Sequence, residues 1–256
     1  MQENEFKYYE SIGNWDFDQI KCKTEKKTNW DFYEKIKENT NEASICLDLG
    51  TGGGEKVLKY YPEVKKIIAT DFSESMINTA KENLSKAQNK SNVEFKVMDN
   101  LNMTFENNTF DLISARHTII NAKQIYNCLK PGGVLIIEGI DKADCTEIKD
   151  IFGRGQAYLD EISISEIDYK DLKDAGFENI EAVKIYEDEY YETEEDLLAL
   201  LLKTPILDDF SEIKSQENFK HNERIEKDLF DKYVEKYKTE KGILLKRVLY
   251  GIIARK

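Results

Sequence analysis

The sequence predicts an α/β fold in which a doubly wound, mostly parallel sheet carries helices on both faces. From residue 45 onward, short β-rich runs alternate with helical patterns, which is typical of strands joined by crossover helices. A glycine-rich turn joins the first run to the first helix. The 256 residues, of which 40% are hydrophobic, suffice for one domain with a sizeable core and a smaller cap.

Seven runs are predicted as strands because they are apolar or alternate apolar with polar residues. In chain order they are Ile45–Leu49, Val64–Thr70, Val93–Val97, Phe110–Ala115, Val134–Glu138, Ile180–Tyr186 and Leu244–Ala254. Helices are expected over Glu55–Tyr61, after the capping Ser73, over Asn121–Leu129 up to the Pro131-Gly132-Gly133 turn, and from Ser165, with Asp168 placed for a capping box.

The stretch before the last strand departs from this alternation. Thr193 and Asp196 form a capping-box pattern ahead of an apolar run, and a second helical pattern covers Phe219–Tyr237. The predicted organisation is a helical and aromatic cover segment over 1–40, a core over 41–186, a helical insertion over 187–242, and the last core strand over 243–256. We interpret the insertion as a lid over a pocket at the carboxyl ends of the strands, with an acidic surface appendage as the alternative.

Composition restricts the function classes. The formal charge of −13 repels a phosphate backbone and therefore disfavours nucleic acid as a partner. The acidic amino terminus resembles neither a signal peptide nor an anchor, and no apolar stretch is long enough to span a bilayer. Four scattered cysteines and two histidines give no metal-ligand spacing, so no metal is expected. A cytoplasmic protein is the expectation.

The glycine turn follows a buried strand and opens a helix. Gly50, Gly52 and Gly54 allow backbone to approach a ligand closely and to adopt positive φ. Such turns serve dinucleotides as well as S-adenosylmethionine (SAM), so the glycines alone do not discriminate. Asp48 favours SAM, because a carboxylate just ahead of the turn repels a pyrophosphate and suits the amino group and sulfonium of SAM.

Two further acids end the next strands. Asp71 lies about 20 residues past the turn, where a carboxylate binds ribose hydroxyls, although a helix N-terminal acid is the alternative. Phe72 follows it and is placed to lie against an adenine. Asp99 ends the third strand, where it is expected to accept the adenine amino hydrogen, with a solvated loop acid as the other interpretation.

These motifs stand in the order seen in class I SAM-dependent methyltransferases, and the chain resembles their ubiquinone/menaquinone-biosynthesis-like small-molecule branch. The resemblance covers residues 45 to 186 and implies a Rossmann-like sheet whose last strand is reversed. The segments that carry it are Asp48–Gly54, Asp71-Phe72-Ser73, Val97-Met98-Asp99, Phe110–Ala115 and Leu129-Lys130-Pro131-Gly132-Gly133.

The resemblance also implies roles for individual residues. SAM is the implied cofactor and S-adenosylhomocysteine its product. The residues implied to bind it are Asp48, Gly50, Thr51, Gly52, Gly54, Asp71, Phe72, Met76, Asp99, Asn100, Leu101, Ala115 and Arg116. This chain departs from the family in a short segment after the fourth strand and in the 187–242 insertion. Both alter the substrate pocket, so the resemblance does not identify the substrate.

Several residues are candidates for the methyl acceptor. His117 follows the fourth strand and is either a general base or a structural histidine. Arg154, flanked by two glycines and followed by Gln156, either clamps an acidic group of the substrate or is an exposed helix-end residue. Trp15 and Trp30 are either pocket walls or packing anchors.

The predicted function is methyl transfer from SAM to a small-molecule acceptor. An RNA or protein methyltransferase and a SAM-binding protein without activity are the alternatives. A nicotinamide dehydrogenase is disfavoured by Asp48 and by the proline-glycine turn.

Overall fold

The computed structural model describes residues 19–88, 90–208 and 225–256. The chain divides into two compact units. We call one the core unit, which comprises Trp30–Ile140, Ile164–Lys184 and Tyr250–Lys256, and the other the accessory unit, which comprises Met1–Asn29, Asp141–Ser163 and Ile185–Leu249. Each is described separately below.

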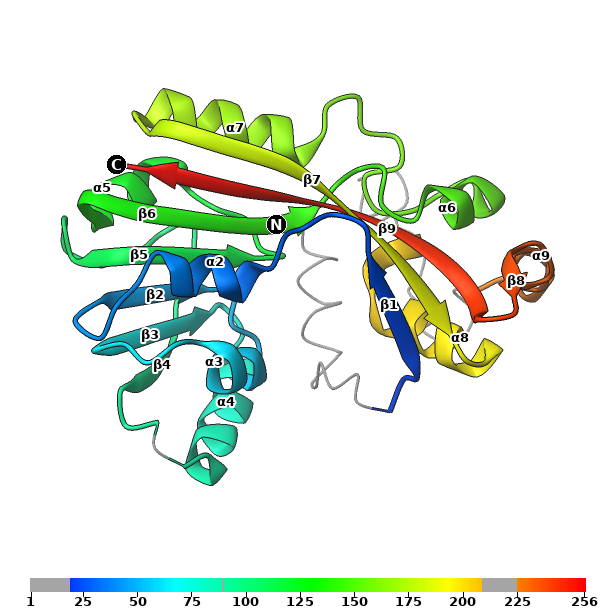
Figure 1. The fold of residues 1–256 in the computed structure, drawn as a ribbon, viewed down its shortest axis with the longest axis horizontal. Coiled ribbons are helices and arrows are strands. Elements are labelled where there is room, and N and C mark those ends of the chain that lie inside the picture. Colours follow the sequence, from blue (N-terminus) through cyan, green and yellow to red (C-terminus); the bar gives the residue numbers. More distant parts are fainter. Residues whose placement is uncertain (1–18, 89, 209–224) are drawn as a thin grey trace. The chain divides into compact units, whose positions relative to one another are not determined.

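The sheet of the core unit contains the seven predicted strands in the order β7-β9-β6-β5-β2-β3-β4 (Figure 1). Their bounds are β2 Ile45–Leu49, β3 Lys66–Asp71, β4 Val93–Val97, β5 Phe110–Arg116, β6 Leu129–Ile140, β7 Glu178–Tyr191 and β9 Gly242–Arg255. β2 pairs in parallel with both β3 and β5, β3 with β4, and β5 with β6. β9 runs against β6, as reciprocal backbone hydrogen bonds between Gly132–Gly133 and Lys256 show. The reversed last strand is therefore confirmed.

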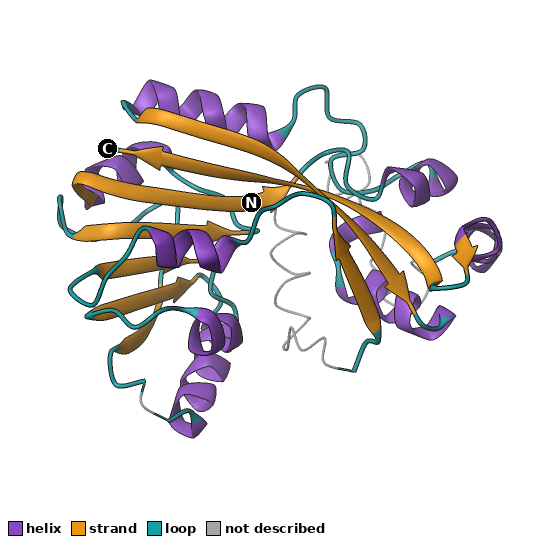
Figure 2. Cartoon of the chain, in the orientation of Figure 1, coloured by secondary structure: helices purple, strands orange, loops and turns teal. Residues whose placement is uncertain are grey.

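Among the described residues, five helices belong to the core unit: α2 Phe32–Glu38, α3 Glu55–Tyr60, α4 Glu74–Lys86, α5 Ala122–Cys128 and α7 Ile164–Ala175. Figure 2 draws the helices of the described residues in purple and the strands in orange. α5 and α7 pack together, and their apolar residues, including Ile125 and Leu172, bury against β2, β5 and β6. α2 packs against β6 and α4 against β3 and β4. As predicted, Ser73 caps α4 by accepting a hydrogen bond from the Met76 backbone.

Two predicted boundaries and one predicted capping role in this unit are wrong. β6 begins at Leu129, directly after α5, so the Pro131-Gly132-Gly133 turn lies inside the strand rather than closing a helix before it. A register irregularity between β5 and β6 at Phe110 and Leu112 accommodates it. α7 begins at Ile164, so Ser165 lies in its first turn, and Asp168 instead accepts a hydrogen bond from the Tyr250 hydroxyl. Terminal turns are set by tertiary packing that local patterns do not record.

The accessory unit is built on β1 Cys22–Lys26, the adjoining ends of β7 and β9, and β8 Lys238–Thr239. β1 pairs antiparallel with β7, and β8 with β9. Neither β1 nor β8 is among the predicted strands. Helices α6 Thr146–Phe152, α8 Glu194–Lys203 and α9 Lys227–Tyr237 and the 3-10 turn η1 Pro205–Leu207 surround a second apolar cluster.

The predicted insertion over 187–242 supplies much of this unit. The Thr193–Asp196 capping box is present at the start of α8, and α9 covers the end of the helical pattern over Phe219–Tyr237, whose first residues lie outside the described ranges. Residues 141–163 group with this unit as well. The lid role of the insertion stays a prediction.

Candidate functional site

The turn after β2 has the backbone that its glycines predict. Gly50, Gly52 and Gly54 all have positive φ, at 71°, 56° and 77°. A Cβ on Gly50 would lie 2.6 Å from the Thr118 side chain, whereas one on Gly52 would meet nothing within 4 Å. The Thr51 backbone N–H donates to the Thr70 carbonyl at 2.8 Å and joins the turn to β3. The turn is therefore fixed at its ends and open at Gly52, where a ligand has room.

Asp48 lies beneath this turn, in the last part of β2. It is 6% exposed and accepts a hydrogen bond of 2.6 Å from the Ser114 hydroxyl. Burial raises the pKa of the Asp48 carboxyl to about 6, although the Ser114 hydrogen bond opposes part of that effect. A buried carboxylate whose hydrogen-bond donor is neutral is suited to a cationic ligand.

Asp71 ends β3, the neighbour of β2. Its carboxylate accepts hydrogen bonds from the backbone N–H groups of Gly52 at 2.9 Å and Ser73 at 3.0 Å. Burial raises the pKa of Asp71, and these backbone donors oppose the rise. A carboxylate offers about four acceptor positions, and the Phe72 backbone also donates to it, so acceptor capacity remains for a ligand hydroxyl. The geometry suits the predicted ribose role.

Two neighbouring residues after β4, Asp99 and Asn100, each carry a side-chain oxygen that could accept a hydrogen bond from a ligand. Asp99 is exposed and accepts from the Leu101 backbone at 2.9 Å and the Asn102 amide at 2.7 Å, and these bonds lower its pKa. Asn100 is buried and donates to the Thr118 hydroxyl at 3.0 Å. Its amide oxygen, Oδ1, is buried with no hydrogen-bond partner in the structure. Asn100 is therefore a second candidate acceptor for a ligand amino group, beside Asp99, whose role stays a prediction.

The other predicted cofactor residues surround the same strand ends. Phe72 is half-buried after β3, and Met76 is buried in the first turn of α4. Ala115 is buried near the end of β5, and Arg116 ends that strand. Because the carboxyl ends of parallel strands meet at one edge of the sheet, the structure brings these residues to one side of the core unit.

A charged and aromatic group at the ends of β5 and β6 was not predicted. The Arg116 Nε donates to Glu138 at 2.7 Å, and the Trp30 indole donates to the other oxygen of Glu138 at 3.0 Å. Tyr33 stacks on Tyr60 with 5.3 Å between ring centroids, and burial raises the pKa of its hydroxyl. Trp30 is thus a buried member of this group, and its two predicted roles, pocket wall and packing anchor, stay predictions. Its spacing from Glu138, 108 residues along the chain, gives no local signal.

His117 follows Arg116 with φ of 53°, a left-handed conformation that is uncommon outside glycine. Its backbone N–H donates to the Glu138 carbonyl at 2.8 Å, and its side chain is exposed. The strand thus turns sharply at His117 and places Thr118 against Gly50 and Asn100. Thr118, which we had not predicted, links the turn to the segment after β4.

Arg154 and Gln156 lie in the accessory unit and bind other residues of it. The Arg154 guanidinium donates to the Leu207 carbonyl and to Glu226, the latter at 3.0 Å. The Gln156 backbone carbonyl accepts from the buried Lys149 ammonium at 2.8 Å. These contacts tie α6 to η1 and to the start of α9. The clamp role predicted for Arg154 and Gln156 stays a prediction, and Trp15 lies outside the described residues.

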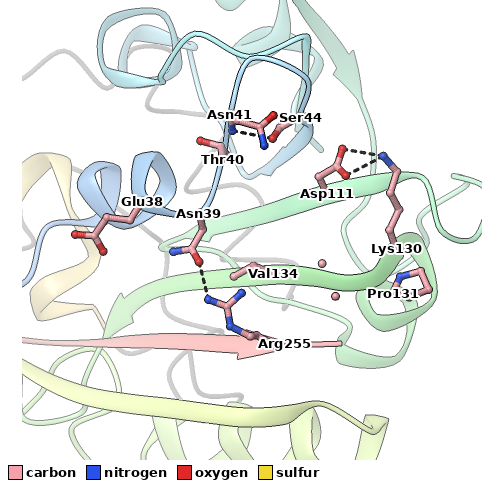
Figure 3. A pocket seen from close by; sticks show the side chains of 12 residues that line it. Glu38, Asn39, Thr40, Asn41, Ser44, Asp111, Lys130, Pro131, Val134 and Arg255 are labelled. Carbon is pink, nitrogen blue, oxygen red and sulfur yellow. Dashed lines mark hydrogen bonds and ion pairs between the residues drawn. The ribbon is translucent and has the colours of Figure 1, made fainter.

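A cavity of about 460 Å³ opens at the opposite, amino edge of the core sheet (Figure 3). Its walls include the ion pair of Asp111 with Lys130 and the hydrogen bond from Arg255 to Asn39. None of the predicted cofactor residues lines it. In the described ranges, no helix is long and apolar enough to cross a membrane, and no cluster of three or more His, Cys, Asp or Glu is placed to hold a metal.

The residues at the carboxyl edge fit SAM. Asp48 supplies a buried negative charge for an ammonium, Asp71 supplies acceptors for hydroxyls, and the bare Asn100 oxygen supplies one for an amino group. The open face of Gly52 leaves space for the ligand.

Comparisons with known proteins agree with this fit. A family model described as a methyltransferase domain matches residues 40–196, more than half of the chain. Phosphoethanolamine N-methyltransferase 3 from Arabidopsis thaliana is 28% identical over 164 residues, 60% of this chain and 32% of the relative. The ubiquinone/menaquinone biosynthesis C-methyltransferase of Hydrogenovibrio crunogenus is 28% identical over 104 residues, 37% of this chain and 41% of the relative. The matches thus span about a third to two fifths of these relatives.

A crystal structure of a putative methyltransferase from Bacillus halodurans has the same fold. It superposes with a TM-score of 0.55 at 20% identity and covers 88% of this chain and 98% of its own. Together with the glycine turn and the acids that follow it, the family match assigns SAM as the cofactor. The chain belongs to the methyltransferase domain family and, within it, to the class I SAM-dependent fold similar to the ubiquinone/menaquinone branch.

Proposed function

We propose that this protein transfers the methyl group of SAM to a small-molecule acceptor. The observation that carries the proposal is the buried carboxylate of Asp48 beneath an open glycine turn, with a neutral hydroxyl as its hydrogen-bond donor. A cationic donor such as SAM is what this arrangement favours. The formal charge of −13 favours a small acceptor over RNA, and the two curated relatives named above are small-molecule methyltransferases by name.

The protein's part in such a reaction is mainly positioning. SAM supplies an already activated methyl group when bound, so the chain must orient it, hold the acceptor in line and exclude water. Asp48 would hold the ammonium end of the cofactor and Asp71 its ribose, and Asn100 would accept from its base. Arg116, which ends β5 and pairs with Glu138, would bind the cofactor's carboxylate.

A general base is needed only if the acceptor must lose a proton. His117 is the candidate, because its exposed side chain follows the last residue of β5. If it is the base, His117→Ala should lower kcat about 100-fold and leave SAM affinity unchanged. An unchanged kcat with a bound acceptor would assign His117 a structural role at the turn.

The test of the proposal is transfer of label from methyl-labelled SAM. The purified protein is incubated in parallel with a small-molecule extract, a protein fraction and total RNA, with Asp71→Ala as the negative control. Label in the small-molecule fraction supports the proposal. Label in protein or RNA would replace it with a macromolecular acceptor, and SAM binding without transfer to any fraction would indicate a non-catalytic SAM-binding protein.

A further inference from the structure

Behind Asp48 lie two buried hydroxyl groups that no role above uses. Ser114 is on β5, and the register of β2 and β5 places it directly opposite Asp48. Tyr61 follows the end of α3. Ser114 is fully buried and Tyr61 is 4% exposed, and their hydroxyl oxygens are 2.7 Å apart. The chain of contacts therefore runs from Tyr61 through Ser114 to Asp48.

Each hydroxyl has one hydrogen to donate, and this decides which group is the donor in the hydrogen bonds that join Tyr61, Ser114 and Asp48. An ionised carboxylate only accepts, so the Ser114 hydroxyl donates its one hydrogen to Asp48 across 2.6 Å. The Leu47 carbonyl, at 3.4 Å from the same hydroxyl, is the weaker alternative acceptor. With its hydrogen committed to Asp48, Ser114 can only accept from Tyr61. Both hydroxyl dipoles then point their positive ends toward Asp48, which stabilises the charged form of the carboxylate.

The charged and titratable groups facing Asp48 come from every neighbouring element. They are Tyr33 on α2, Cys46 on the same strand, Tyr61 after α3, Asp71 on β3 and Arg116 on β5. Arg116 favours the carboxylate, and Asp71 opposes it. Tyr61 remains a neutral hydroxyl, because burial raises its pKa well above the ordinary value. It therefore acts on Asp48 as a hydrogen-bond donor and not as a charge.

We propose that Tyr61 and Ser114 are positioning residues that orient Asp48 and keep it ionised for the ammonium group of SAM. This inference rests on the proposed function for its cofactor and adds two residues that do not touch the ligand. A chain of neutral donors suits this task, because it adds to the favourable charge of Arg116 without bringing a further cation that would compete with the ligand.

The experiment measures SAM affinity by titration calorimetry between pH 5 and pH 8 for the wild type, Tyr61→Phe and Ser114→Ala. Tyr250→Phe is the matched control, since it also removes a tyrosine hydroxyl that donates to a partly buried carboxylate of the core unit, but at Asp168. Carboxyl NMR of the ligand-free proteins, with Asp48 assigned through Asp48→Asn, gives a second readout. Thermal melting identifies any variant that does not fold.

We expect Tyr61→Phe to weaken SAM binding about three- to tenfold at pH 7 and Ser114→Ala about ten- to hundredfold. In both, the pH midpoint of binding and the Asp48 titration should move upward, while Tyr250→Phe leaves both unchanged. If Ser114→Ala does not fold, Tyr61→Phe alone decides. Weaker binding by Tyr61→Phe with an unmoved midpoint would overturn the proposal alone, whereas a wild type that binds no SAM would overturn the proposed function with it.

Discussion

Both units bury carboxylates, but they give them different partners. In the core unit, Asp48 accepts from a serine hydroxyl and Asp71 from two backbone N–H groups. In the accessory unit, Asp144 is 1% exposed and receives the Arg247 guanidinium at 2.9 Å and 3.2 Å. The Val248 backbone adds a third donor, and Arg247 also meets Glu189 at 3.3 Å.

The kind of donor distinguishes a carboxylate that is suited to bind a ligand from one that stabilises the fold. A buried acid with a cationic partner is internally neutralised and joins elements of the fold. A buried acid whose direct hydrogen-bond donors are neutral keeps a negative charge that is compensated only in part, and this costs stability until a cationic ligand arrives. Removing the first kind should therefore damage the fold, and removing the second should damage ligand binding.

The largest effect is expected for Asp144→Ala. Without Asp144, the guanidinium of Arg247 remains buried against Glu189 alone, so the free energy of unfolding should fall by about 3 to 5 kcal/mol. Chemical denaturation followed by circular dichroism measures it. Asp48→Asn is the comparison in the core unit and should be neutral or stabilising. A larger loss from Asp48→Asn than from Asp144→Ala would contradict the distinction.

Asp71→Ala should reduce SAM affinity by roughly 100-fold, because it removes the charge-assisted hydrogen bonding that Asp71 would offer to the ribose. Equilibrium dialysis against labelled SAM gives the dissociation constant. Asp71→Asn, which retains one acceptor oxygen, is the matched variant, and its SAM affinity should fall less. An equal fall in SAM affinity in both variants would show that the carboxylate holds the Gly52 backbone and not the ligand.

SAM affinity should rise about tenfold between pH 5 and pH 7, because the pKa of Asp48 is raised to about 6. The α-amino group of SAM stays protonated in this window.

The stability of the ligand-free protein should change with pH in the opposite sense to the SAM affinity. A folded-state pKa above the ordinary 3.8 contributes stability below that value, and this contribution is lost as pH rises through about 6. Asp48→Asn should flatten both profiles, and a pH profile of affinity that is the same with and without Asp48 would exclude this cause.

Arg154→Ala is expected to have the smallest effect, a loss of about 1 kcal/mol in the free energy of unfolding. Its ion pair with Glu226 is half exposed and contributes little, and the bond to the Leu207 carbonyl supplies most of the loss. If Arg154 also clamps the acceptor, the KM for that acceptor rises while the affinity for SAM does not. Glu226→Gln, which breaks the same ion pair, is the control.

Local features of the sequence predicted most of the geometry of the candidate cofactor site. A strand followed by three alternating glycines, and acids at the ends of successive strands, are short patterns whose geometry follows from the parallel sheet. Asp48, Asp71 and the positive φ angles of the glycines could therefore be inferred residue by residue. The same reasoning placed all seven core strands.

The partners of those residues could not be inferred in this way. Ser114 meets Asp48 only because of the register between β2 and β5, and Trp30 meets Glu138 through packing across the unit. Asp99 and Asn100 are adjacent in sequence, and only the backbone turn decides which is buried. The strand β1 was missed because Cys22–Lys26 is largely charged and exposed, and its pairing with β7, not an apolar pattern, makes it a strand.

The Trp30 indole, hydrogen-bonded to Glu138 beside Arg116, also gives the protein an optical reporter. The chain has two tryptophans, so Trp15→Phe leaves Trp30, at the cofactor edge of the core sheet, as the single tryptophan to be excited selectively. Its emission depends on the charges next to the ring, and any ligand that draws Arg116 away from Glu138 changes them. Cofactor arrival can then be followed in real time by stopped flow without a labelled ligand, which makes the order of donor and acceptor binding measurable.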